Sequence, residues 1–117
     1  MYTGLIIKES LADEIILDYV EIKSTEIWKT DNMPRYWTAI TFSSNIEDFP
    51  EKLSKALNFS SESGMIWYVD FQNDEYKYIV LKDNVLKYRI GNNEEKNSIC
   101  RKCIELGIKK EQLDWAN

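Results

Sequence analysis

The stretch MIWYVDFQNDEYKYIVLKDNVLKYRI, residues 65–90, carries the strongest β-strand signal in the chain. Its three runs of β-branched and aromatic residues, 66–71, 76–81 and 85–90, are separated by short polar breaks. Apolar runs of this length, bounded by Asn and Asp, are typical of antiparallel strands joined by tight turns. Asp83 and Asn84 both tolerate a positive φ, so we expect them to form a two-residue hairpin turn. The stretch therefore predicts three consecutive antiparallel strands.

Strands and helices are also expected before this stretch. A strand is predicted at 2–8 and two more at 22–30 and 36–43, where Thr, Ile, Trp, Tyr and Phe are frequent. Between the first two, the segment from Ser10 resembles a variant capping box, and its apolar residues recur at helical spacing. The same residues also alternate, which is compatible with a strand. A second helix is expected to begin at Asp48.

The last predicted helix runs from Asn93 to Leu106 and is stopped by Gly107. The element order is then β-α-β-β-α-β, followed by a β-hairpin and a helix. We expect a single α+β domain over residues 1–117, with an antiparallel sheet in ferredoxin-like order and a C-terminal hairpin extension and helix. This fold accommodates many functions, so it assigns none.

The composition excludes several classes of function. The chain has 117 residues, of which 20 are acidic, 15 are basic and none is histidine, giving a net charge of −5. A Ser-His or Cys-His nucleophile and a His-rich metal site therefore cannot be built. Nucleic acid is disfavoured as a partner because the sequence has no basic stripe. No run is apolar enough to cross a membrane and no export signal is visible, so we expect a cytoplasmic location.

Cys100 and Cys103 form a CxxC motif, which is compatible with redox chemistry or zinc binding. The motif lies well inside the predicted helix, whereas redox cysteines of this type sit at a helix N-terminus. Both thiols fall near the centre of the helix's apolar arc, and zinc would need a second copy of the chain to complete four ligands. We therefore expect both cysteines to be buried in the core, with no metal or other cofactor.

Asp70 interrupts an otherwise apolar predicted strand. A carboxylate held on an apolar sheet can have a raised pKa and act as a general acid or base. Alternatively, it faces solvent or pairs with Lys77 or Arg89 across the hairpin. We favour the second interpretation, because no nucleophile, oxyanion donor or phosphate-binding loop accompanies Asp70.

Large aromatic residues occur on both faces of the predicted sheet. Strand alternation places Trp37 on the face opposite Tyr36, and it places Trp67 opposite Tyr68. Most of these rings should belong to the core, but one face could form an exposed aromatic surface unless the C-terminal segment with Trp115 covers it. The candidate ligand-binding residues are Arg35, Trp37, Tyr68, Asp70, Tyr78 and Arg89.

Four sequence patterns carry a resemblance to a known group of proteins. They are Tyr36-Trp-Thr38, Trp67-Tyr-Val-Asp-Phe71, Val85-Leu-Lys-Tyr-Arg-Ile-Gly91, and Leu106-Gly-Ile108 followed by Gln112-Leu-Asp-Trp115. Together they resemble a family of small, uncharacterised, single-domain prokaryotic proteins. The resemblance implies that the C-terminal segment belongs to the domain, and it transfers no activity and no functional residue.

These observations favour a binding or interaction module without intrinsic catalysis. We expect a homodimer that buries an aromatic patch containing Trp37, Tyr68 and Tyr78. The partner would be a small ligand or a basic protein, and an acidic inhibitor or immunity-type protein is one alternative. The other alternative is an enzyme that uses Asp70, Tyr78 and Arg89 in a pocket on the sheet.

Overall fold

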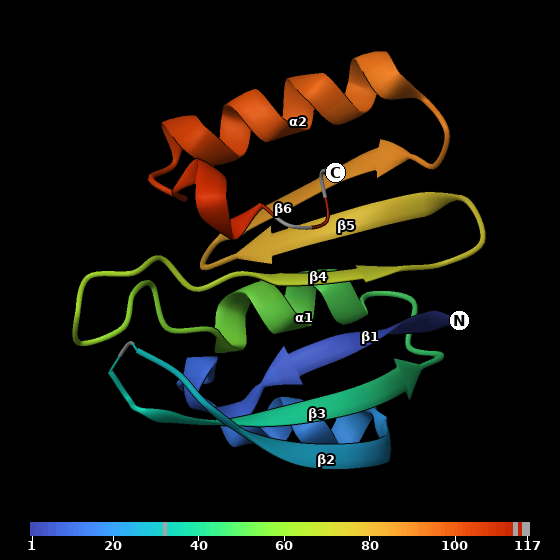
Figure 1. Ribbon diagram of the computed structural model, residues 1–117. Helices are drawn as coiled ribbons and strands as arrows, with labels where there is room; N and C mark the ends of the chain where they lie inside the picture. Colours follow the sequence, from blue (N-terminus) through green and yellow to red (C-terminus); the bar gives the residue numbers. More distant parts are fainter. Residues whose placement is uncertain (32, 114, 116–117) are drawn as a thin grey trace.

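Figure 1 shows the computed structural model, which describes residues 1–31, 33–113 and 115. Within those residues six strands form one antiparallel sheet in the order β2-β3-β1-β4-β5-β6. The strands are β1 (Tyr2–Ile7), β2 (Glu21–Lys29), β3 (Tyr36–Ser44), β4 (Val69–Gln72), β5 (Tyr76–Leu81) and β6 (Asn84–Arg89). With α1 (Phe49–Ala56) and α2 (Asn93–Glu105), they confirm the predicted α+β class.

The two faces of the sheet are covered by different helices. On β5, Val80 belongs to a buried cluster that includes Phe49 of α1. Its neighbour Ile79 belongs to a second buried cluster that includes Cys103 of α2. Because neighbouring residues of a strand point to opposite faces, α1 and α2 lie on opposite sides of the sheet. Figure 1 shows α2 running along β6, at one end of the sheet.

The segment between β1 and β2 differs from the predicted helix. It forms two 3₁₀ helices, η1 (Lys8–Ser10) and η2 (Glu14–Tyr19), and the second is capped by Asp13, which accepts a hydrogen bond from the Ile15 N–H at 2.9 Å. The predicted Ser10 cap is wrong, because its hydroxyl donates to the Ile7 carbonyl at 2.6 Å. Leu11 pairs with Leu57 in a β-bridge, and this holds the chain extended where the helix was expected to begin.

Strand β4 is shorter than its predicted range of 66–71. Ile66 instead pairs with Ser60 in an isolated bridge, and the Trp67 N–H donates to the Phe59 carbonyl at 3.1 Å. Trp67 therefore lies outside the regular alternation of β4. The prediction that Trp67 shares a face with Val69 relied on strand alternation, which begins only at Val69.

The turn between β5 and β6 is one residue earlier than predicted. Leu81 pairs with Asn84, so the two loop residues are Lys82 and Asp83. Asp83 has a φ of 60°, a left-handed conformation that Asp tolerates better than most residues. The turn chemistry expected for Asp83 is present, but Asn84 is already the first residue of β6.

Strands β1 and β4 share fewer paired residues than any other neighbouring strands of the described sheet. Their junction holds two residue pairs, Thr3 with Gln72 and Gly4 with Phe71, within the described residues. A Cβ at Gly4 would lie 2.5 Å from the Phe71 Cβ, so only glycine allows this approach. The junction joins two three-stranded halves, β2-β3-β1 and β4-β5-β6.

Helix α2 ends as predicted. Gly107 has a φ of 102°, and the Ile108 N–H donates back to the Cys103 carbonyl at 3.1 Å. Cys103 is fully buried, whereas Cys100 is half-buried, so the prediction of two core thiols is confirmed for Cys103 alone. Burial raises the pKa of the Cys103 thiol to about 11. None of the helices among the described residues has the length and apolarity that a membrane span requires.

Candidate binding groove

The face of the sheet that carries α2 is covered over β5 and β6 but open over β1, β2 and β3. The register places Trp28 of β2 directly across from Trp37 of β3. On β1, Leu5 and Ile7 pair with Thr41 and Ala39, which lie on the same face of β3 as Trp37. Because paired residues of an antiparallel sheet share a face, all of these side chains lie on the open side.

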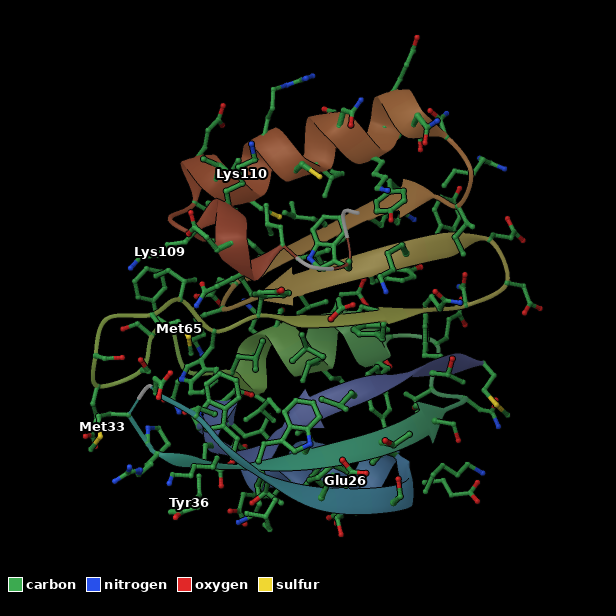
Figure 2. All side chains as sticks on the ribbon, viewed as in Figure 1. Glu26, Met33, Tyr36, Met65, Lys109 and Lys110 are labelled. Carbon is green, nitrogen blue, oxygen red and sulfur yellow. The ribbon has the colours of Figure 1, made fainter. Side chains whose placement is uncertain are left out.

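A groove of about 670 Å³ lies on this open face. Its floor is the sheet, and its walls come from the connection between α1 and β4 and from the segment after α2. We call it the tryptophan groove, lined by Leu5, Ile7, Trp28, Trp37, Met65, Ile66, Trp67, Tyr68, Asp70, Lys77, Gln112 and Trp115. Figure 2 shows one wall residue, Met65, at the left of the view, as are Met33, Tyr36 and Lys109.

All four tryptophans of the chain line the groove. Trp37 packs against Trp67 with ring centroids 5.1 Å apart, so Trp67 lies on the groove side rather than with Val69. Trp115 stacks on Tyr88 of β6 at 6.0 Å, and the Trp28 indole N–H donates to the Glu26 carboxylate at 2.9 Å. Each indole is therefore held in place by its own contacts.

Two of the indoles have buried nitrogens that find no partner among the residues the structure describes. The Nε1 atoms of Trp37 and Trp115 are shielded and make no hydrogen bond within the described part of the chain. Buried polar groups are usually paired, and an unpaired donor costs about 1–3 kcal/mol. Both donors belong to groove residues, but because the nitrogens are shielded, an acceptor in the groove would reach them only after the indole rings move.

Two charged side chains of the groove lie on β4 and β5. The Lys77 ammonium is 2.9 Å from the Asp70 carboxylate, and both side chains are more than half shielded from solvent. The register pairs Gln72 with Lys77, so Asp70 is the diagonal neighbour of Lys77 on the same face. The predicted pairing of Asp70 with Lys77 is confirmed, and the pair leaves this end of the groove close to neutral.

One wall of the groove is fastened to the C-terminal segment. The Tyr68 hydroxyl donates to the Gln112 carbonyl. The α carbon of Gly107 also faces Ile66, where an added Cβ would meet the Ile66 Cγ1 at 3.3 Å. These contacts place the segment after α2 against the connection before β4, and the stacking of Trp115 on Tyr88 places it over β6. Of the two alternatives left open by the sequence, an exposed aromatic face or one covered by the C-terminal segment, each therefore applies to part of this face. Asp114, Ala116 and Asn117 lie outside the described residues.

The predicted ligand-binding residues are only partly brought together. Trp37, Tyr68 and Asp70 line the groove. Tyr78 is buried on the opposite face, where it stacks on Phe71 at 5.3 Å and an interplanar angle of 7°, so the predicted patch of Trp37, Tyr68 and Tyr78 is wrong. Tyr78 pairs with Phe71 in the sheet, and this register turns it towards α1.

Neither predicted arginine approaches Asp70. Arg35 is exposed in the loop before β3, where its carbonyl accepts the Thr30 N–H at 2.7 Å. Arg89 pairs with Tyr76 in the register and donates to the Tyr76 hydroxyl at 3.2 Å. The enzyme hypothesis required Asp70, Tyr78 and Arg89 to meet in one pocket. They do not.

Sequence reasoning did not single out most of the groove as a site. The residues it missed are Leu5, Ile7, Trp28, Met65, Ile66, Trp67, Lys77, Gln112 and Trp115. The sequence did contain a signal for Trp28. If Thr30 and Arg35 close the hairpin, counting outward along both strands places Trp28 across from Trp37. The wall residues gave no such signal, because irregular segments have no side-chain period.

Comparisons with protein-family models, with curated proteins and with solved structures give no match to this chain. The resemblance based on the Trp67–Phe71 and Gln112–Trp115 patterns therefore stays a prediction. The function has to be inferred from the geometry and chemistry of the groove.

Proposed function

We propose that this protein is a non-catalytic binding module whose ligand occupies the tryptophan groove. The ligand is an uncharged molecule with a planar ring system and a hydrogen-bond acceptor. The observation that carries the proposal is the pair of buried, unpartnered indole donors, Trp37 Nε1 and Trp115 Nε1, within the described residues of one aromatic groove.

The size and lining of the groove support a small ring compound. Ligand pockets are mostly apolar, typically about 300–1,000 Å³, and contain a few placed polar groups. The groove has a volume of about 670 Å³ and an aromatic lining, which suit stacking of a planar ring. In this proposal the Trp37 and Trp115 rings turn on binding, so that their N–H groups meet the acceptor and orient the ligand.

The ion pair supports the choice of an uncharged ligand. Asp70 and Lys77 already neutralise each other at 2.9 Å. A charged ligand group placed beside them would gain from one partner and be repelled by the other, and it would also have to lose its hydration. A neutral ring avoids both costs.

The order of the strands supports a finer proposal about the fold. In this order β3 separates β1 from β2, and β1 separates β3 from β4. Such separation of consecutive strands is typical of the split β-α-β arrangement of ferredoxin-like domains. In this proposal η1 and η2 replace the first helix, while β5, β6 and α2 are the extension.

The inhibitor alternative is supported by the net charge of −5 alone. An acidic protein can associate with a basic partner through long-range attraction. The groove would have no role in that hypothesis, so a ligand-binding experiment separates the two.

The test is calorimetric titration with three ring compounds of similar size. Coumarin is neutral and has a carbonyl acceptor, naphthalene is neutral without one, and 2-naphthoate is charged. We expect coumarin to bind several-fold more tightly than the other two, because one buried hydrogen bond contributes about 1 kcal/mol. Failure of all three to bind would contradict the proposal.

A matched pair of variants tests the role of the orphan donor. Trp37→Phe keeps an aromatic ring but removes one of the two N–H groups, and it should reduce the preference for coumarin over naphthalene. Trp28→Phe is the control, since its N–H is already bonded to Glu26 at 2.9 Å. Equal loss of preference in both variants would show that ring size, rather than the free donor, selects the ligand.

A further inference from the structure

Strand β2 is an outer strand of the sheet, and all nine of its residues are exposed. Among the described residues no strand pairs with its outer side. Long unpaired edges are templates for pairing with another chain, and monomeric proteins usually shorten, bend, cover or charge them. Strand β2 has lysines at 23 and 29, but its segment from Ser24 to Trp28 contains none. The long exposed edge of β2 therefore needs an explanation.

The direction of the free backbone groups can be read from one hydrogen bond. The Thr30 N–H donates to the Arg35 carbonyl at 2.7 Å, and the register continues without a shift from Lys29 back to Ser24. Antiparallel pairs alternate between bonded and non-bonded, so Trp28, Glu26 and Ser24 direct their N–H and C=O groups towards β3. Thr25, Ile27 and Lys29 direct theirs away from the sheet.

Exposed apolar side chains accompany this edge. Ile27 is 67% exposed and Trp28, at the outer end of the tryptophan groove, is 38% exposed. Ile27 and Lys29 both face the α1 side of the sheet. Tyr36, which pairs with Lys29, is exposed on the same face. The edge thus offers both backbone groups and apolar surface to a partner.

We infer that β2 pairs with β2 of a second copy of this chain, antiparallel, about a two-fold axis through Ile27. This register pairs Ile27 with its own copy and Thr25 with Lys29, so all three outward-facing residues of the regular segment join the ladder. On the groove face it places Trp28 across from the partner's Glu26, a carboxylate that accepts an indole N–H within its own chain at 2.9 Å.

The neighbouring registers are each less favourable. An axis at Glu26 places two carboxylates directly opposite, and an axis at Lys29 does the same for two ammonium groups. An axis at Trp28 leaves Thr25 opposite Asp31, which lies beyond the end of β2. An axis at Thr25 reaches the irregularity between Ile22 and Ser24, where the strand no longer alternates.

This dimer differs from the face-to-face packing expected from the sequence. It joins the two sheets edge to edge and leaves the tryptophan groove open in each copy. The two grooves then lie on the same face of one continuous sheet and meet at the two Trp28 residues. The inference does not depend on the proposed ligand.

Analytical ultracentrifugation at micromolar concentration tests the pairing. We expect the wild-type protein to sediment at about twice its mass of 13.8 kDa. Ile27→Lys and Ile27→Glu should each sediment as monomers, because like charges then lie opposite each other at the axis. An equimolar mixture of the two variants should recover the dimer, since opposite charges meet in the mixed pair.

Ile104→Lys on α2 is the control, because it adds the same charge at an exposed apolar residue far from β2 in sequence. It should remain dimeric, and circular dichroism should show all variants folded. A monomeric wild type would overturn the inference. A dimer that survives Ile27→Lys would also overturn it. If that dimer is lost on Trp37→Glu, the two copies pack face to face instead.

Discussion

The two halves of the α2 side of the sheet contain different kinds of side chain. Over β5 and β6 this face carries a buried cluster that includes Ile79 and Cys103. Over β2, β3 and β1 the face carries Trp28 and Trp37, which retain partial exposure. An indole combines a large apolar ring with one polar N–H, so it suits a surface that is apolar and still contacts water. One face of one sheet is therefore core at one end and an open aromatic surface at the other.

Two isoleucines of the same face provide the sharpest test of this difference. Ile79→Ala in the covered half should lower the free energy of unfolding by about 3 kcal/mol, because it leaves a cavity in a closed cluster. Ile7→Ala in the open half should cost about 1 kcal/mol, since solvent or a side chain can fill the space. Urea denaturation measures both values, and equal losses would mean that the open half is packed as tightly as the covered half.

The buried thiol gives the next largest effect. The pKa of Cys103 is raised from 9.0 to about 11, so between these values the unfolded chain loses a proton that the folded chain keeps. Stability should therefore be fully present below pH 9 and fall as the pH rises, by about 1 kcal/mol between pH 8 and pH 10. Urea denaturation at the two pH values measures the loss.

Cys103→Ala should reduce this pH dependence, although it also lowers stability at both pH values by removing packed atoms. Part of the dependence should remain, because burial and its contact with Tyr78 raise the pKa of Tyr2 to about 12 with the same sign. An unchanged slope in the variant would show that Cys103 does not contribute. Thiol labelling of the native protein should modify Cys100 before Cys103.

The smallest effect concerns the ion pair at the boundary of the two halves. A double-mutant cycle with Asp70→Asn and Lys77→Gln should give a coupling energy below about 1 kcal/mol, because both side chains keep some contact with water. The coupling should weaken further as salt is added. A value of several kcal/mol, insensitive to salt, would place the pair in the covered half.

The strands, the end of α2 and the opposite directions of Tyr36 and Trp37 could be predicted from the sequence, because these depend on local period and on Gly107. The face of Tyr78 relative to Trp37 could not. Strand alternation relates residues within one strand, whereas the relation between strands depends on register, and a shift of one residue reverses the face. The face of Tyr78 follows from its pairing with Phe71 of β4, a register that no local pattern predicts.

The groove could be predicted only in part for the same reason. Trp37, Tyr68 and Asp70 belong to predicted strands, where alternation gives a direction, although Tyr68 lies just before β4 in the structure. Trp67 and Trp115 come from irregular segments, and their positions depend on tertiary contacts such as the stacking of Trp115 on Tyr88. No local pattern in the sequence encodes these contacts.

The short junction at Gly4 and Phe71 has a mechanical consequence for the groove. The floor of the groove extends from β3 across β1 to β4 and β5, so it spans this junction. Any change in the angle between the two three-stranded halves therefore changes the width of the groove. A molecule seated across the junction contacts both halves and favours the angle that fits it, so that occupancy of the groove and the bend of the sheet become a single coupled equilibrium.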